Sequence, residues 1–122
     1  MKFADLNRKP LEYRKPYEMV EELGLTETHP EYGATTAPVK VKSLWISRSS
    51  EYREDRKSAV AELGGDHEGI AVNLPSHMIP VVDDILRDGE SLSMIARGRV
   101  GLAFYEYENK FGQQTSAFWV DL

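Results

Sequence analysis

The residues with the clearest chemical potential are flat aromatic side chains near the C-terminal end of the chain. Alternate positions of the segment 99–108 carry small residues or tyrosines, namely Gly101, Ala103, Tyr105 and Tyr107. We place Ala117 and Trp119 of the segment 115–122 on the same face of a hairpin. Bases can approach the backbone over glycine and alanine and stack on the rings, and each stacked base contributes about 1–3 kcal/mol. The pattern therefore predicts a stacking surface for nucleobases.

A second group of candidate residues combines positive charge with aromatic rings. Basic side chains flank Trp45 and Tyr52, namely Lys40, Lys42, Arg48, Arg53, Arg56 and Lys57. Lys110 adds a cation in the connection between the last two segments. These cations are candidates for contacts with phosphates. Acidic residues at 51, 54 and 55 dilute the charge, and a mixed-charge loop is also typical of a solvated surface.

The same aromatic residues allow two other interpretations. They could pack beneath the N-terminal part of the chain or against a second copy, because aromatic pairs stabilise antiparallel sheets by themselves. They could also anchor a partner protein, since tyrosine and tryptophan dominate the energetics of many interfaces. The sequence leaves these alternatives open.

Patterns for catalysis and metal binding are absent from the sequence. It has no cysteine, and His29, His67 and His77 lack a second ligand at helical or hairpin spacing. The segment 84–90 has the acidic character of a calcium loop, but Leu86 stands where an oxygen ligand is required. No nucleophile, phosphate-loop or dinucleotide motif occurs. We therefore expect no enzyme activity, no cofactor and no metal.

The elements that must position these residues begin after an irregular N-terminal arm, residues 1–38. Four prolines interrupt this arm, and only Pro16 to Leu23 has a helical pattern, with Gly24 as its stop. We expect turn and extended chain from 26 to 38, because a proline biases the residue before it away from helix.

From Val39 onward, β-branched and aromatic residues alternate with polar ones, which predicts strands. The first strand, 39–49, changes phase, and a bulge near Lys42 and Ser43 would return Leu44 and Ile46 to the core face. We expect further strands over about 57–63 and 69–74, joined through the glycines at 64 and 65.

A helical segment follows, with Ser76 as a candidate cap and an apolar stripe at 81, 82, 85 and 86. We expect it to break near Asp88 and Gly89 and to end at Arg97 and Gly98. Its acidic side chains, Asp83, Asp84, Asp88 and Glu90, form either a solvated face or a patch for a basic protein partner. Two strands, about 99–108 and 115–122, complete the predicted order.

This order of strand, strand, strand, helix, strand, strand resembles the OB-fold. The chain is thus predicted to be mainly β, with an OB-like five-stranded antiparallel barrel over 39–122 and the arm over 1–38. The long first strand, the passage VNLPSHM and the terminal hairpin resemble small single-strand-binding proteins of phages and mobile elements. The resemblance implies binding of single-stranded DNA or RNA, with the loop after the first strand and the last hairpin loop bordering the groove.

From the resemblance and the candidate residues we expect a nucleic-acid-binding surface made of Lys40, Lys42, Trp45, Arg48, Tyr52, Arg53, Tyr105, Tyr107, Lys110 and Trp119. The alternative is a protein-interaction module of a phage or mobile element that docks on a host or replication protein through the same aromatic face. Either interpretation is compatible with a homo-oligomer.

Composition and net charge restrict the class of protein and the kind of binding surface that we expect. The chain has 122 residues, 41% of them hydrophobic and 29% charged, which predicts a globular domain with one core. No apolar run approaches the roughly 20 residues of a membrane span, and no leader is evident, so we expect a cytoplasmic protein. The formal net charge is −5, so any nucleic-acid surface must be locally basic.

Overall fold

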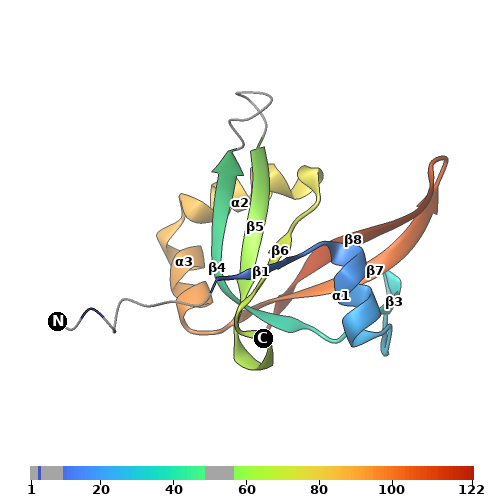
Figure 1. The fold of residues 1–122 in the computed structure, drawn as a ribbon, viewed down its shortest axis with the longest axis horizontal. Coiled ribbons are helices and arrows are strands. Elements are labelled where there is room, and N and C mark those ends of the chain that lie inside the picture. Colours follow the sequence, from blue (N-terminus) through green and yellow to red (C-terminus); the bar gives the residue numbers. More distant parts are fainter. Residues whose placement is uncertain (1–2, 4–9, 49–56) are drawn as a thin grey trace.

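The computed structural model describes residue 3 and residues 10–48 and 57–122, which form a mainly β fold (Figure 1). An 8-stranded mixed sheet has the order β1-β6-β5-β4-β7-β3-β2, and β8 pairs with β7. The α-helices of the described part are α1 (Pro16–Leu23), α2 (Ile79–Leu86) and α3 (Gly89–Ala96). The prediction of a mainly β protein is confirmed.

The first long strand, β4 (Val39–Arg48), contains the predicted bulge. Its register against β5 (Lys57–Leu63) shifts between Val41 and Ser43. The extra residue restores the alternation, so Val39, Val41 and Leu44 are all buried. The strand β6 (Ile70–Asn73) pairs antiparallel with β5, after a short 3-10 turn over Gly65–His67.

The helical segment breaks where the sequence predicts, but it begins differently. Asp88 caps α3 by accepting a hydrogen bond from the Ser91 backbone N–H, and Gly98 follows α3 with φ 70°. Ser76 is not the cap of α2, because a 3-10 turn over Ser76–Met78 precedes that helix and places Met78 at the N-cap.

The last two strands, β7 (Val100–Asn109) and β8 (Gly112–Asp121), form a long hairpin that extends away from α2 and α3 (Figure 1). Their pairing runs from Val100↔Asp121 to Asn109↔Gly112 without a shift. The turn is therefore tighter than the predicted connection and leaves only Lys110 and Phe111 between the strands. Gly112 allows this turn because its φ of 100° is accessible to glycine without steric conflict.

The N-terminal arm contains the predicted helix and three short strands that the sequence analysis missed. The strand β1 (Glu12–Arg14) pairs parallel with β6, whereas β2 (Glu27–His29) and β3 (Gly33–Thr35) form a hairpin beside β7. Between them α1 contacts β7 and β8, and its Met19 and Val20 belong to the main hydrophobic core. The arm thus contributes three strands to the sheet and one helix to the core.

The sheet is not closed into a barrel in the described part of the chain. Among those residues, β6 pairs with β5 and β1, and β8 pairs with β7. The core nevertheless forms one cluster that includes Met19 of α1, Val82 of α2 and Phe104 of β7. Helix α1 therefore contributes to the same core as the sheet and the other helices.

The helices of the described part are all short. None of them is both long and apolar enough to cross a membrane.

Candidate nucleic-acid interface

The outer face of β4, β5, β6 and β1 carries two aromatic side chains, with apolar residues and one carboxylate between them. Trp45 of β4 pairs with Val60 of β5, and Val60 pairs with Asn73 of β6. Ala71 lies two residues before Asn73 on β6, and therefore on the same face, and it pairs with Tyr13 of β1. Paired residues of neighbouring strands project from the same face of a sheet. Glu62 of β5 pairs with Ala71 and so lies on this face as well. Trp45 and Tyr13 thus stand on opposite sides of a floor made by Val60, Ala71 and Glu62, and we call this surface the sheet platform.

The two aromatic side chains of the sheet platform are accessible, whereas the apolar side chains between them are buried. Val60 is 2% exposed and Ala71 is fully buried, yet neither belongs to the main core cluster. Trp45 is half-buried and Tyr13 is 54% exposed. Both aromatic rings are therefore accessible from solvent, whereas Val60 and Ala71 between them are buried. Tyr13 was not among the sequence-predicted residues, because the arm offered no sign of a strand.

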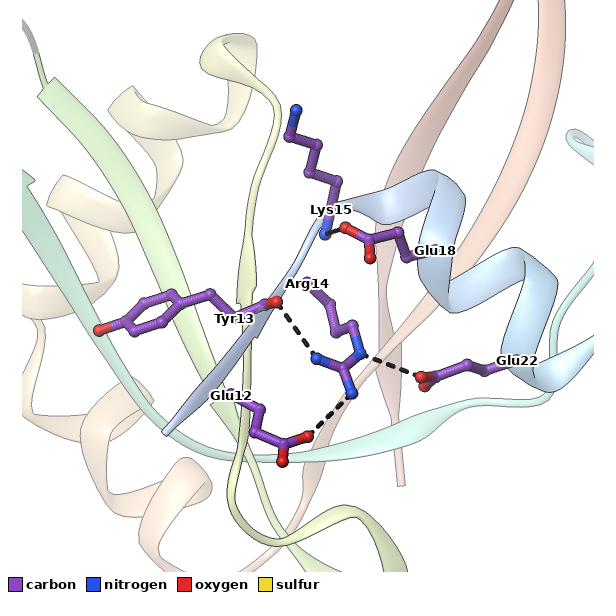
Figure 2. A network of polar contacts seen from close by, with 6 residues as sticks. All are labelled: Glu12, Tyr13, Arg14, Lys15, Glu18 and Glu22. Carbon is purple, nitrogen blue, oxygen red and sulfur yellow. Dashed lines mark hydrogen bonds and ion pairs between the residues drawn. The ribbon is translucent and has the colours of Figure 1, made fainter. Parts of the chain in front are cut away.

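Strand β1 is held in place by a polar network centred on Arg14 (Figure 2). The Arg14 guanidinium donates hydrogen bonds to Glu22 of α1 at 3.0 Å and to Glu12 at 2.9 Å. These hydrogen bonds, first to Glu22 and then to Glu12, raise the pKa of Arg14 above its ordinary value. Tyr13 projects from the opposite side of β1. The network thus fixes the strand that presents Tyr13 to the sheet platform.

Lys42 lies at the bulge beside the sheet platform and is engaged with carboxylates. Its Nζ is 3.7 Å from Glu62 and 3.7 Å from Glu68, and the Ser43 hydroxyl donates to the other oxygen of Glu62 at 2.9 Å. The bulge places Lys42 and Ser43 on the side of Glu62. Lys42 can therefore contact a phosphate only by giving up or sharing these partners.

The outer face of the β7–β8 hairpin also carries aromatic residues, but the arm covers most of them. Tyr32, in the turn between β2 and β3, stacks on Phe118 with ring centroids 4.4 Å apart and an interplanar angle of 21°. Tyr32 also lies 4.6 Å from the ring of Tyr105, and His29 lies 5.0 Å from Phe118. Tyr107 is the most accessible member, at 40% exposed. The interpretation that these aromatics pack beneath the N-terminal arm thus matches the observed contacts.

The predicted position of Trp119 on this outer face is wrong. Trp119 pairs with Leu102, and Phe118 pairs with Ala103, so the phase of β8 is shifted by one residue from the prediction. Leu102 lies in the core, and Trp119 packs against that core from the inner side. The aromatic partner of Tyr105 on the outer face is therefore Phe118.

The remaining predicted residues fall in several places. Lys40 and Lys42 line a groove of about 300 Å³ with Arg97, Gly64 and Gly98. Arg48 is exposed at the end of β4, opposite Lys57 of β5. Tyr52 and Arg53 lie outside the described residues.

At the end of the β7–β8 hairpin, Lys110 and Phe111 form an exposed pair. The Lys110 Nζ lies 5.1 Å from the centroid of the Phe111 ring, which is a cation–π contact. The Phe111 side chain is 77% exposed. The hairpin therefore presents one aromatic ring and one cation to solvent.

A polar groove of about 420 Å³ lies between the sheet platform and the hairpin. Residues of the arm, of β6 and its following turn, and of β8 line it: Lys15, Pro16, Tyr17, Asn73, Leu74, Pro75, Gln113, Gln114 and Thr115. Asn73 belongs to both the groove and the sheet platform. The groove thus continues the platform toward the hairpin and supplies hydrogen-bond donors and acceptors.

Within the described residues, no group of three or more His, Cys, Asp or Glu side chains is placed to hold a metal ion. Comparisons with protein-family models, with curated proteins and with solved structures each found no match for this chain.

Proposed function

We propose that this protein is a non-enzymatic single-stranded nucleic-acid-binding protein, for DNA or RNA, which binds along the sheet platform. The observation that carries the proposal is the pair Trp45 and Tyr13, which rise from one sheet face on either side of Val60 and Ala71. Aromatic side chains on a shallow sheet surface bind bases of any sequence, because every base has a π-face.

The strand pairings support an OB-like architecture for the region 39–122. Strand β4 pairs with both β5 and β7, β5 pairs with β6, and β7 pairs with β8. In OB-folds the face of the second and third strands and the loops beside it bind oligonucleotides, and the barrel itself is partly open. Strands β5 and β6 hold those positions, and β1 adds Tyr13 to the same face.

Stacking alone is too weak for useful affinity. Two stacked bases contribute about 2–6 kcal/mol, whereas a micromolar dissociation constant corresponds to about 8.2 kcal/mol. We infer that phosphate contacts from exposed cations supply the remainder. Exposed cations on β4, β5 and the hairpin end are the candidates, namely Lys40, Arg48, Lys57 and Lys110.

The test is a titration with fluorescently labelled oligo-dT, with a duplex of equal length as the control ligand. We expect Trp45→Ala and Tyr13→Ala each to weaken single-strand binding by about 1–3 kcal/mol, which is about 5- to 150-fold. Trp119→Phe is the matched control, because Trp119 packs against the core and is not part of the sheet platform. This replacement also leaves Trp45 as the only source of tryptophan emission. Circular dichroism checks that the variants are folded.

Substitution of Tyr107 tests whether nucleic acid binds the hairpin instead of the sheet platform. Tyr107→Ala should have a smaller effect than Trp45→Ala, because Tyr105 and Phe118 beside Tyr107 are engaged with Tyr32. A larger loss with Tyr107→Ala would move the binding surface to the hairpin. Equal affinity of the wild type, Trp45→Ala and Tyr13→Ala would exclude the sheet platform.

The exposed end of the hairpin favours a second candidate function, docking on a replication or host protein. Phe111 is 77% exposed at the far end of a hairpin that projects from the fold. An exposed aromatic ring of this kind is a natural anchor for an interface. This candidate predicts a stable complex that survives nuclease treatment and is lost in Phe111→Ser, with Lys110→Ser as the control for charge.

A further inference from the structure

An apolar pocket lies on the side of the molecule away from the sheet platform. It has a volume of about 220 Å³ and lies between α2, α3 and the paired ends of β7 and β8. Apolar side chains form most of its lining, with one hydroxyl and one carboxylate: Ile85, Met94, Ile95, Val100, Trp119 and Val120, with Ser91 and Asp121. Helices α2 and α3 contact β4 on its inner face, whereas Trp45 stands on the outer face. A ligand in this pocket would therefore leave the sheet platform free.

The size of the pocket suits one amino-acid side chain. Pockets for drug-sized ligands and cofactors start at about 300 Å³, and this pocket is smaller. Its lining includes a tryptophan and a methionine, and these residue types are enriched where proteins bind each other. Trp119 is only half-buried although it packs on the core, so part of its ring is available to a ligand.

The charges around the pocket define the partner. Asp121 lines it and is exposed, and the Asp88 carboxylate accepts a 2.6 Å hydrogen bond from the hydroxyl of the lining residue Ser91. Asp84 and Glu90 are exposed next to the lining residues Ile85 and Ser91. Arg87 is held by Asp83 at 3.2 Å. The carboxylates placed at the pocket are therefore Asp121 and Asp88, and this negative charge disfavours a nucleic acid and favours a basic ligand.

From the pocket and its rim, the structure assigns a protein-docking site that binds one large apolar side chain, flanked by lysines or arginines, of a partner protein. The apolar side chain would lie against Trp119 and Met94, and the flanking cations would face Asp121 and the α2–α3 carboxylates. This inference does not depend on the proposed nucleic-acid binding, because no residue is shared between the pocket and the sheet platform.

The experiment uses the full chain carrying Trp45→Phe, so that Trp119 is the one tryptophan signal. The probe is a capped peptide with one leucine between pairs of lysines, and the readouts are Trp119 emission and the NMR signal of its indole N–H. Two control peptides replace the leucine by alanine or the lysines by glutamates. We expect saturable shifts with the probe and about tenfold or weaker binding of both controls.

Two protein variants connect the binding to the pocket. Asp121→Lys changes an exposed side chain at the rim and should weaken the lysine peptide about fivefold or more while the fold is retained. Met94→Glu places a charge in the apolar lining and should abolish binding. No shift with the probe, equal binding of all three peptides, or unchanged affinity in Asp121→Lys would each overturn the assignment.

Discussion

Thr36 joins the arm to β7 through two hydrogen bonds in a fully buried position. Its backbone N–H donates to the Phe104 carbonyl at 2.9 Å, and its side-chain oxygen accepts from the Phe104 N–H at 3.0 Å. Thr36→Val keeps the shape but leaves the Phe104 N–H without a partner. We expect the free energy of unfolding to fall by about 1–3 kcal/mol in urea denaturation.

Thr28→Val is the control for this change, because Thr28 is exposed on β2. A loss of the same size in Thr28→Val, or no loss in Thr36→Val, would contradict the assigned role of the buried hydrogen bond.

Asp88 makes the stability of α3 depend on pH. Hydrogen bonds from the Ser91 hydroxyl and then the Ser91 backbone N–H lower the pKa of this carboxyl below its ordinary value. Its stabilising contribution is therefore fully present above the unfolded-state pKa of about 3.9 and is lost as the pH falls through the lower folded-state pKa. We expect Asp88→Ala to lower the melting temperature at neutral pH, with a difference from wild type that shrinks below about pH 4.

Melting curves of both proteins between about pH 7 and pH 2 test this expectation. Asp84→Ala is the matched control, because Asp84 is exposed on the neighbouring helix and its carboxylate makes none of the described side-chain hydrogen bonds. A difference between Asp88→Ala and wild type that stays constant with pH would refute the role of the ionised cap.

Among the elements, α3 offers a comparison between two glycines at its ends. Gly89 is the first helical residue and has open space where a Cβ would lie, whereas Gly98 has φ +70° and Lys40 atoms 3.3 Å from that position. Gly89→Ala should stabilise the protein by about 0.4–1 kcal/mol, because it restricts the unfolded chain. Gly98→Ala should destabilise it by about 1–2 kcal/mol, because alanine resists the left-handed conformation.

Thermal unfolding of the two variants measures both effects. If the melting temperature changed in the same direction in both variants, the backbone conformations of Gly89 and Gly98 would differ from those described.

The elements predicted well were those with long, regular patterns. The bulge in β4 followed from a phase slip between Val41 and Leu44, and the bounds of β5 and α1 matched the prediction. The predicted phase of β8 was wrong because Phe118, Trp119 and Val120 are consecutive and all large, so alternation cannot identify which of them faces the core. Its pairing with β7 decides the phase instead.

The candidate site was predicted only in part, for a related reason. Trp45 lies on a ten-residue strand whose pattern is evident, and it belongs to the sheet platform. Tyr13 lies on a three-residue strand whose partner, β6, is far along the chain. Such a strand is specified by tertiary packing rather than by local preference, so no local pattern could reveal it.

For the whole molecule, the net charge of −5 limits how strongly salt can affect binding to a single strand. Each neutralised phosphate contributes about 0.7 to the slope of log K against log salt, so three or four contacting cations predict a slope between about −2 and −3. Titrations with oligo-dT from about 50 to 200 mM salt measure this slope. A much steeper slope would require a larger basic surface than the described residues provide.

Lys110→Ala should make the slope shallower by about 0.7 if Lys110 contacts one phosphate. Arg87→Ala is the control, because Arg87 is the C-cap residue of α2, is paired with Asp83 at 3.2 Å and is not among the proposed phosphate contacts.

The packing of the arm into the sheet has a consequence for how the chain folds during synthesis. Glu12–Arg14 needs Ile70 to Val72 as its partner, and Met19 needs the core around Phe104 and Ala117. The ribosome makes the arm before any of these residues. Contacts between segments so distant in sequence form slowly, because the loop between them must be closed first. The arm therefore leaves the ribosome before the segments it packs against. Helix α1 can dock only after β7 and β8 have been made, and Tyr13 can join the sheet platform only after β6 has been made.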